Sequence, residues 1–265
     1  MARSLRKVVR TCKVAFAVLL VGTATGWSEE TSDLDAIAGH LVPEKVAKAL
    51  VGIPDESRKL LALRSYVRFS GDLDERWSWT EEEIAAFRGT DAQLALQAEI
   101  DAIGADFSER NPGHEIYVHS SVRSLDTQIA HWNENDSVGL SARELHDAWR
   151  ESEAASIDPA DPDALRRFRS WLKGFDPAST AHIAAPGLSR HGRAHAIDFQ
   201  VMKNGEIIAG TDYEEIETVW KEGGWGKKLK ESVTAAGPSF SGPLASPHEP
   251  WHYDYAPDPV RVVQQ

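Results

Sequence analysis

Apolar residues recur at helical spacing through the first part of the chain, from Asp33 to about Phe107. Two segments show the pattern clearly, Glu56 to Arg64 and Glu81 to Phe87, and polar breaks separate them. Thr80 stands before three glutamates, which is typical of a helix N-cap followed by acids in the first turn. We therefore expect a helical region that packs on the rest of the protein and carries no chemistry of its own.

The pattern changes after Asn111, where short β-branched and aromatic runs indicate strands. The expected elements are a strand at residues 115–119, a helix from Ser124 through Trp132, a strand at 194–201, helices at about 213–221 and 227–235, a loop at 237–247 and a last strand at 251–255. Asn204-Gly205 lies between two apolar pairs, which predicts a type I′ hairpin.

Residues 134–186 are polar and rich in Asp, Ala and Pro. We expect them to form an excursion on the surface, with one helix at about residues 164–172. The whole order of elements predicts an α+β fold, in which a small antiparallel sheet carries the functional site, helices flank it, and a helical extension precedes it.

The first 26 residues have the composition of a secretory signal. Five basic residues precede an apolar stretch from Val14 to Gly22, and Gly22-Thr23-Ala24 provides a cleavage site. The apolar stretch is short for a membrane span of about 20 residues, and an uncleaved anchor is the alternative. We therefore expect an exported protein of the periplasm or cell envelope, which contacts the membrane only if this segment is retained.

Charge and cysteine content narrow the chemistry further. The net charge is −12 at pH 7, and the body of the chain is strongly acidic, which would repel phosphates and excludes a nucleic-acid partner. Cys12 is the only cysteine and precedes the apolar stretch. The exported part would hold no thiol, so disulfides, cysteine nucleophiles and thiolate ligands are excluded, and any metal must be held by nitrogen and oxygen.

The strand predicted at residues 194–201 separates two kinds of side chain, because successive residues point to opposite faces. The odd positions, from His195 to Val201, are expected to be core, with His195 as a hydrogen-bonded core or supporting residue. Asp198 shares its face with two alanines, which leave room for a metal beside it. His191 lies in the preceding loop, which must curl back for both side chains to meet.

Two imidazoles and a carboxylate, His191, Asp198 and His252, would complete a three-ligand zinc site. Glu249 stands three residues before His252, and Pro250 forbids a regular helix there, so we expect a turn or bulge that brings both to one place. A carboxylate beside the metal can take a proton from an activated water and pass it to a leaving amine. Glu249 is therefore the predicted general base.

These residues form a pattern that resembles a known family. The pattern consists of Ser189-Arg190-His191, Ala196 and Asp198, followed by Glu249-x-x-His252. It is similar to the signatures of the D-alanyl-D-alanine carboxypeptidase and endolysin-type zinc metallopeptidases, the group of vancomycin-resistance D,D-carboxypeptidases and L-alanyl-D-glutamate peptidases. The resemblance implies that the two histidines and Asp198 bind Zn²⁺ and that Glu249 is the catalytic base.

The segment from Ser121 to Gln128 is similar to the strand-to-helix segment of the same family. The resemblance implies that Arg123 holds the scissile carbonyl or the oxyanion, and that Gln128 and Ser189 contribute to substrate binding. We place Trp251 at the pocket wall, whereas the other tryptophans have spacings that suit packing.

The resemblance covers roughly residues 110–257. We therefore divide the chain into a signal segment or anchor (1–26), a helical region (27–110) and a zinc peptidase domain (111–265).

The chain departs from the family pattern at three places. Ala194 replaces a common glycine, Val122 replaces a common aromatic residue, and the stretch between Gln128 and Ser189 is long. The first change is small and does not affect metal binding, whereas the last two concern the substrate pocket and leave the cleaved bond open. The predicted function is hydrolysis of peptidoglycan stem peptides, by a D,D-carboxypeptidase or a stem or cross-link endopeptidase. The alternatives are a wall-binding or regulatory module without turnover and a zinc amide hydrolase acting elsewhere in the envelope.

Overall fold

Apolar side chains gather in two hydrophobic clusters in the computed structural model, which describes residues 33–153 and 157–257. The helical cluster is built from residues 34–67 and 132–188. The sheet cluster is built from residues 96–107 and 194–255. The predicted signal segment lies outside the described residues. Among those that are described, no helix is long and apolar enough to cross a membrane.

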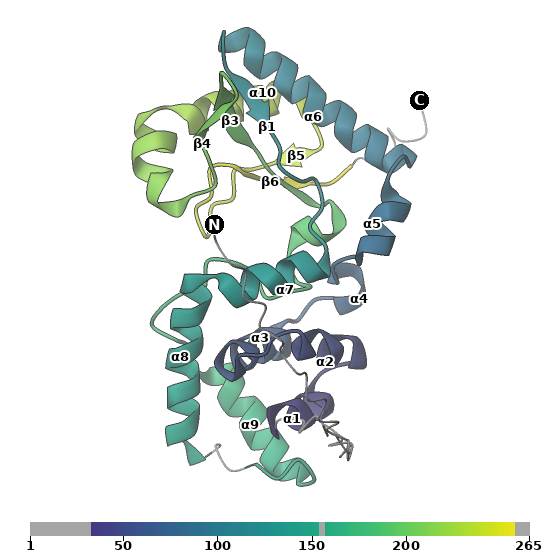
Figure 1. The fold of residues 1–265 in the computed structure, drawn as a ribbon, viewed down its shortest axis with the longest axis vertical. Helices are drawn as coiled ribbons and strands as arrows, with labels where there is room; N and C mark the ends of the chain where they lie inside the picture. The colour runs from purple at the N-terminus through teal and green to yellow at the C-terminus, as the bar shows by residue number, and fades with distance from the viewer. Residues whose placement is uncertain (1–32, 154–156, 258–265) are drawn as a thin grey trace, which may run out of the picture. The chain divides into compact units, whose positions relative to one another are not determined.

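Five helices form the helical cluster (Figure 1): α1 (Asp33–Leu41), α2 (Glu44–Val51), α3 (Glu56–Arg68), α8 (Asp136–Glu151) and α9 (Pro162–Gly174). Helix α3 packs against each of the other four. Its Leu60 and Leu63 are fully buried, and burial of each such side chain stabilises the fold by about 1.5–3 kcal/mol. Helix α9 confirms the helix expected at residues 164–172.

Helix α8 overturns the prediction that residues 134–186 are a surface excursion with a single helix. Its Val138, Ala142, Leu145 and Trp149 are buried against the helical cluster. These residues follow one another at spacings of four, three and four, which is the period of one helix face. The polar residues around these positions led instead to the prediction of a surface segment.

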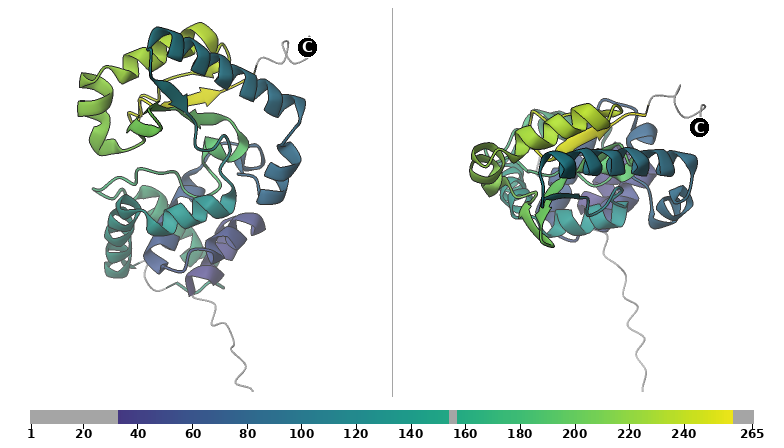
Figure 2. Two further views of the ribbon diagram at one scale, coloured as in Figure 1. Left: turned by 45° about the horizontal axis from the view of Figure 1, so that its top comes forward. Right: turned by 90° about the horizontal axis from the view of Figure 1, so that it is seen from above.

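Four further helices connect the clusters: α4 (Leu73–Arg76), α5 (Glu81–Phe87), α6 (Asp91–Arg110) and α7 (Leu125–Glu134). Thr80 caps α5 and forms a reciprocal capping box with Glu83, which confirms the predicted N-cap. Helix α6 buries Ile103 and Phe107 in the sheet cluster and packs beside α10 (Trp225–Ala236) (Figure 2). The division at residue 110 stays a prediction.

In the described part of the chain, six short strands form two antiparallel sheets of three strands each. The first has the order β1 (Glu115–Tyr117), β3 (Gln200–Lys203), β4 (Glu206–Ala209). The second has the order β2 (Ala196–Asp198), β6 (His252–Tyr255), β5 (Phe240–Ser241). The predicted α+β fold with a small antiparallel sheet and flanking helices is confirmed.

The strand expected at residues 194–201 is two strands, β2 and β3, which belong to different sheets. The break falls at Phe199, whose N–H donates to the carbonyl of Trp251 at 2.9 Å. Ile197, Phe199 and Val201 are fully buried, as predicted. His195 is not a core residue: it precedes β2, its N–H donates to the carbonyl of Arg190, and its side chain is exposed.

The hairpin between β3 and β4 turns at Asn204 and Gly205, whose φ angles of 52° and 82° are those of the predicted type I′ turn. Two helical turns follow, η3 (Tyr213–Glu215) and the π-helix η4 (Ile216–Glu222), where one helix was expected.

Candidate metal centre

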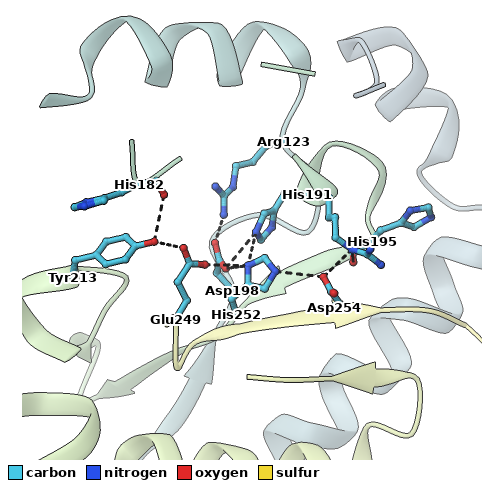
Figure 3. Close-up of polar contacts among 10 residues, drawn as sticks. Arg123, His182, His191, His195, Asp198, Tyr213, Glu249, His252 and Asp254 are labelled. Carbon is cyan, nitrogen blue, oxygen red and sulfur yellow. Dashed lines mark hydrogen bonds and ion pairs between the residues drawn. The ribbon is translucent and has the colours of Figure 1, made fainter. Parts of the chain in front are cut away.

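Three predicted ligands meet at one point in the structure (Figure 3). Nε2 of His191 lies 3.1 Å from Nδ1 of His252 and 3.3 Å from Oδ1 of Asp198. Nδ1 of His252 lies 3.2 Å from the same carboxylate oxygen. Donors bound tetrahedrally at about 2.1 Å from one zinc ion are about 3.4 Å apart. The three atoms therefore form a triangle of the size that a single metal ion requires.

The sheet places two of these ligands. Strands β2 and β6 pair antiparallel, and Asp198 stands directly opposite His252 in the register. Residues opposite each other in such a pair project to the same face. The third ligand, His191, comes from the short helical turn η2 (Arg190–Arg193), which directly precedes β2. This turn provides the backward curl that the sequence required of the loop.

A segment of the first helical region holds η2 in place. The N–H of Trp79 donates to the carbonyl of Gly192 at 2.9 Å, and Ser78 lies directly beneath that glycine. A Cβ at Gly192 would stand 1.9 Å from Oγ of Ser78 and 2.8 Å from Nε2 of Gln128. Only glycine fits this position, because no heavy atoms approach so closely without displacement. The backbone beside His191 is thus fixed by close packing.

Ala194 ends η2 in the left-handed conformation, with φ 56° and ψ 26°. Glycine adopts this conformation without steric cost, whereas alanine does not. Alanine therefore stands at a position whose backbone conformation favours glycine. The chain keeps the turn with alanine, and the methyl group is buried.

Burial and mutual contact set the charges of the ligands. Burial lowers the pKa of His191, which favours the neutral imidazole that binds metals. Burial opposes ionisation of Asp198, but hydrogen bonds from His191 and His252 hold its pKa well below the usual range. Burial alone would lower the pKa of His252, but the hydrogen bond and charge of Asp198 raise it above its ordinary value of 6.5. Three acceptor atoms this close repel one another unless a cation or a proton lies among them.

Metal affinity should therefore weaken as the pH falls. Because the pKa of His252 is raised above its ordinary value, protons compete with a metal for this imidazole more strongly than for a free histidine. We expect the association constant to fall about tenfold per pH unit below that pKa, and to level off above it. Titration calorimetry in two buffers of different ionisation enthalpy checks this, because protons released on metal binding make the observed enthalpy depend on the buffer. An affinity independent of pH between about 5.5 and 8 would contradict it.

Glu249 lies beside the triangle, on the turn that precedes β6. Its Oε2 is 3.4 Å from Nδ1 of His252, and its Oε1 accepts a hydrogen bond from the hydroxyl of Tyr213. Burial raises the pKa of Glu249, and the hydrogen bond from Tyr213 and the charge of His252 partly offset this effect. The predicted turn at Pro250 is present and brings Glu249 and His252 together.

Arg123 reaches the site from the segment before α7. Its guanidinium forms an ion pair with Oδ2 of Asp198, the oxygen that does not belong to the triangle. The N–H of Arg123 donates to the carbonyl of His191 at 3.0 Å, so its backbone is tied to the metal-binding turn. The guanidinium has further N–H groups that can serve as donors to a substrate oxygen.

The second ring nitrogen of His252, which faces away from the other ligands, also has a polar partner. Nε2 of His252 lies 3.5 Å from Oδ1 of Asp254, which pairs with Nε of Arg190 at 2.8 Å. Glu249 and Asp254 thus flank His252 on opposite sides (Figure 3). A carboxylate behind a histidine orients the ring and favours the tautomer that leaves the other nitrogen free for the metal.

The predicted substrate-binding residues occupy different places. Gln128 is buried, and its amide donates to the carbonyl of Arg123 at 2.8 Å, so it supports that residue from behind. Ser189 is half-buried at the start of η2. Trp251 is only 2% exposed, and its ring packs against Tyr213 and Trp220. Trp251 therefore lies behind Tyr213, and its place at a pocket wall stays a prediction.

Sequence reasoning did not identify Tyr213 or Ser78 as residues near the site. Tyr213 stands 36 positions before Glu249, and Ser78 stands 50 positions before its partner Gln128. A lone tyrosine in an acidic segment and a lone serine between two tryptophans carry no pattern. Such contacts arise from tertiary structure, and no sequence signal could have indicated them.

Comparisons with known proteins identify no relative of this chain. No family model matches the chain, and no curated protein or solved structure matches it significantly.

Proposed function

We propose that the protein is an exported zinc metallopeptidase that hydrolyses peptide bonds in bacterial peptidoglycan. The observation that carries this proposal is the triangle of donor atoms from His191, Asp198 and His252, with the carboxylate of Glu249 at its edge. Structural zinc sites are closed by four protein ligands, whereas catalytic sites use three and leave a position open. A structural metal would also have no need of a neighbouring base.

Zinc fits the donor set better than other common ions. Two imidazole nitrogens and one carboxylate oxygen suit zinc, while calcium and magnesium prefer oxygen ligands alone. The described metal-binding group is buried, so the bound ion would act in a site of low dielectric. When bound, zinc supplies a Lewis acid and lowers the pKa of a coordinated water to about 7.

The residues of the chain have separate roles in this proposal. Oε2 of Glu249 takes the proton of the attacking water and passes it to the leaving amine. Arg123 donates to the carbonyl oxygen as negative charge develops there. Its ion pair with Asp198 keeps the guanidinium aimed at the site.

Peptidoglycan is the substrate class that the sequence favours. The signal-like first segment, the lack of cysteine beyond it and the resemblance to D-alanyl-D-alanine carboxypeptidases all suit a cell-wall peptide. The alternatives are a wall-binding module and an amide hydrolase that acts on another component of the envelope.

Digestion of purified muropeptides by the zinc-loaded protein, read by mass spectrometry, tests the proposal. We expect loss of a terminal alanine if the protein is a carboxypeptidase, and a divided stem or cross-link if it is an endopeptidase. Removal of the metal by a chelator should abolish the products, and added zinc should restore them. Unchanged muropeptides with a fully loaded protein would refute peptidoglycan hydrolysis and favour one of the alternatives.

A further inference from the structure

The hydroxyl of Tyr213 donates a hydrogen bond to one oxygen of Glu249, Oε1. The other oxygen, Oε2, faces the metal ligands at 3.4 Å from Nδ1 of His252 (Figure 3). The terminal torsion of a glutamate is broad and roughly two-fold, so a free carboxylate would sample many orientations. With one oxygen held by Tyr213, the carboxylate has a preferred orientation in which the second oxygen points to the site.

Tyr213 is itself held on several sides. Its ring meets Trp251 edge-on, with centroids 5.5 Å apart, and lies 4.6 Å from the ring of His182. Its hydroxyl is also 3.3 Å from the carbonyl of His182. The N–H of His182 donates to Oγ of Ser137 in α8 at 2.9 Å. The tyrosine is thus fixed between the sheet cluster and a loop anchored on the helical cluster.

Two acceptors compete for the hydroxyl proton of Tyr213. A phenol has one proton, and Tyr213 has two acceptors within reach, a backbone carbonyl and a carboxylate. Hydrogen bonds to a charged acceptor are shorter and about twice as strong as those between neutral groups. Tyr66, by contrast, donates only to the carbonyl of Pro186, at 2.8 Å, and has a structural role.

We propose that Tyr213 is the positioning residue of the catalytic base, which holds Glu249 so that Oε2 alone faces the attacking water. This inference rests on the function proposed above. Burial, and then the hydrogen bond and charge of Glu249, raise the pKa of Tyr213, so the phenol keeps its proton throughout the pH range in which a peptidase works. The loop that carries His182 gives the helical cluster a part in aligning the base.

Kinetics of Tyr213→Phe test the proposal. We expect kcat on the muropeptide that the wild type cleaves to fall about tenfold to a hundredfold, because small misplacements of a catalytic group have effects of this size. KM and zinc affinity should stay within about twofold of the wild type. Tyr117→Phe is the matched control, since among the described residues that hydroxyl has one hydrogen-bond partner, the neighbouring His119, and it should leave kcat unchanged. A rise in KM at constant kcat would overturn the proposal.

A double-mutant cycle in the metal-free protein provides a readout other than activity. Tyr213→Phe, Glu249→Leu and the double variant are compared by thermal unfolding after chelation, because leucine has no hydrogen-bond acceptor. We expect their shifts in midpoint to be non-additive by about 2–4 °C, because one hydrogen bond connects the two residues. Additive shifts would overturn the inference even if the protein is a peptidase. If the wild type cleaves no muropeptide, the cycle still decides whether the two residues are coupled.

Discussion

Glutamine in place of Glu249 is expected to reduce turnover about a thousandfold or more and to leave zinc bound. The amide has nearly the shape of the carboxylate but cannot accept and return a proton, and general base catalysis contributes factors of about 10² to 10⁴. The ligand triangle does not include Glu249, so zinc should stay bound, with a rise in its dissociation constant of about tenfold at most for the altered contact with His252.

Parallel measurements of turnover and metal content check this result. Glu222→Gln, an exposed substitution of the same kind in η4, serves as the control and should behave as the wild type. If Glu249→Gln turns over at the normal rate, then another group is the base. If the variant loses zinc as well, Glu249 has a structural part in the metal centre.

Alanine at Gly192 is expected to weaken zinc binding by at least tenfold and to lower the free energy of unfolding by about 1–3 kcal/mol. The new methyl group would stand 1.9 Å from Oγ of Ser78, and that serine is fully enclosed. Relief requires either η2 or the segment around Trp79 to move. Movement of η2 displaces His191 from the triangle, which reduces the metal affinity as well as the stability.

A control variant and a compensating substitution distinguish the effect of the clash at Gly192 from the general effect of replacing a glycine by alanine. Gly104 lies within α6 with nothing within 4 Å of an added Cβ, so Gly104→Ala should raise stability by about 0.5–1 kcal/mol and leave zinc affinity unchanged. Adding Ser78→Gly to Gly192→Ala removes the two nearest atoms, Oγ and Cβ of Ser78, and should restore part of the affinity, because of the three nearest atoms only Nε2 of Gln128, at 2.8 Å, is left. Chemical denaturation and zinc competition measure both quantities. An unaffected metal site in Gly192→Ala would show that η2 tolerates movement.

The sequence sufficed to predict the groups that meet at the metal centre. His191, Asp198, His252 and Glu249 are chemically distinctive, and strand alternation together with Pro250 limits where each can point. The type I′ hairpin was equally predictable, because Asn204-Gly205 has few other conformations available. Local rules therefore succeed where the identity of a residue restricts either its chemistry or its backbone.

The remaining features depend on contacts between distant segments. His195 was assigned to the core by alternation, but the strand begins one residue later, since Ala194 is left-handed. Trp251 was placed at the pocket wall, and its contacts with Tyr213 and Trp220, which bury it, lie outside that prediction. Neither partner could be recognised from the sequence. The spacing of the apolar residues in α8 indicated a buried helix face. The polar composition of the segment nevertheless favoured the prediction of a surface excursion.

The hydrogen bond from Trp79 to Gly192, and the position of Ser78 under that glycine, bear on how the protein can be shortened. A chain that begins after residue 110 retains all the residues assigned to zinc and to catalysis. It lacks Ser78 and Trp79, which pack against the backbone beside His191. It also lacks the apolar side of α6, which packs in the sheet cluster. Such a fragment would contain every residue assigned to catalysis but would lack the segments that hold these residues in position.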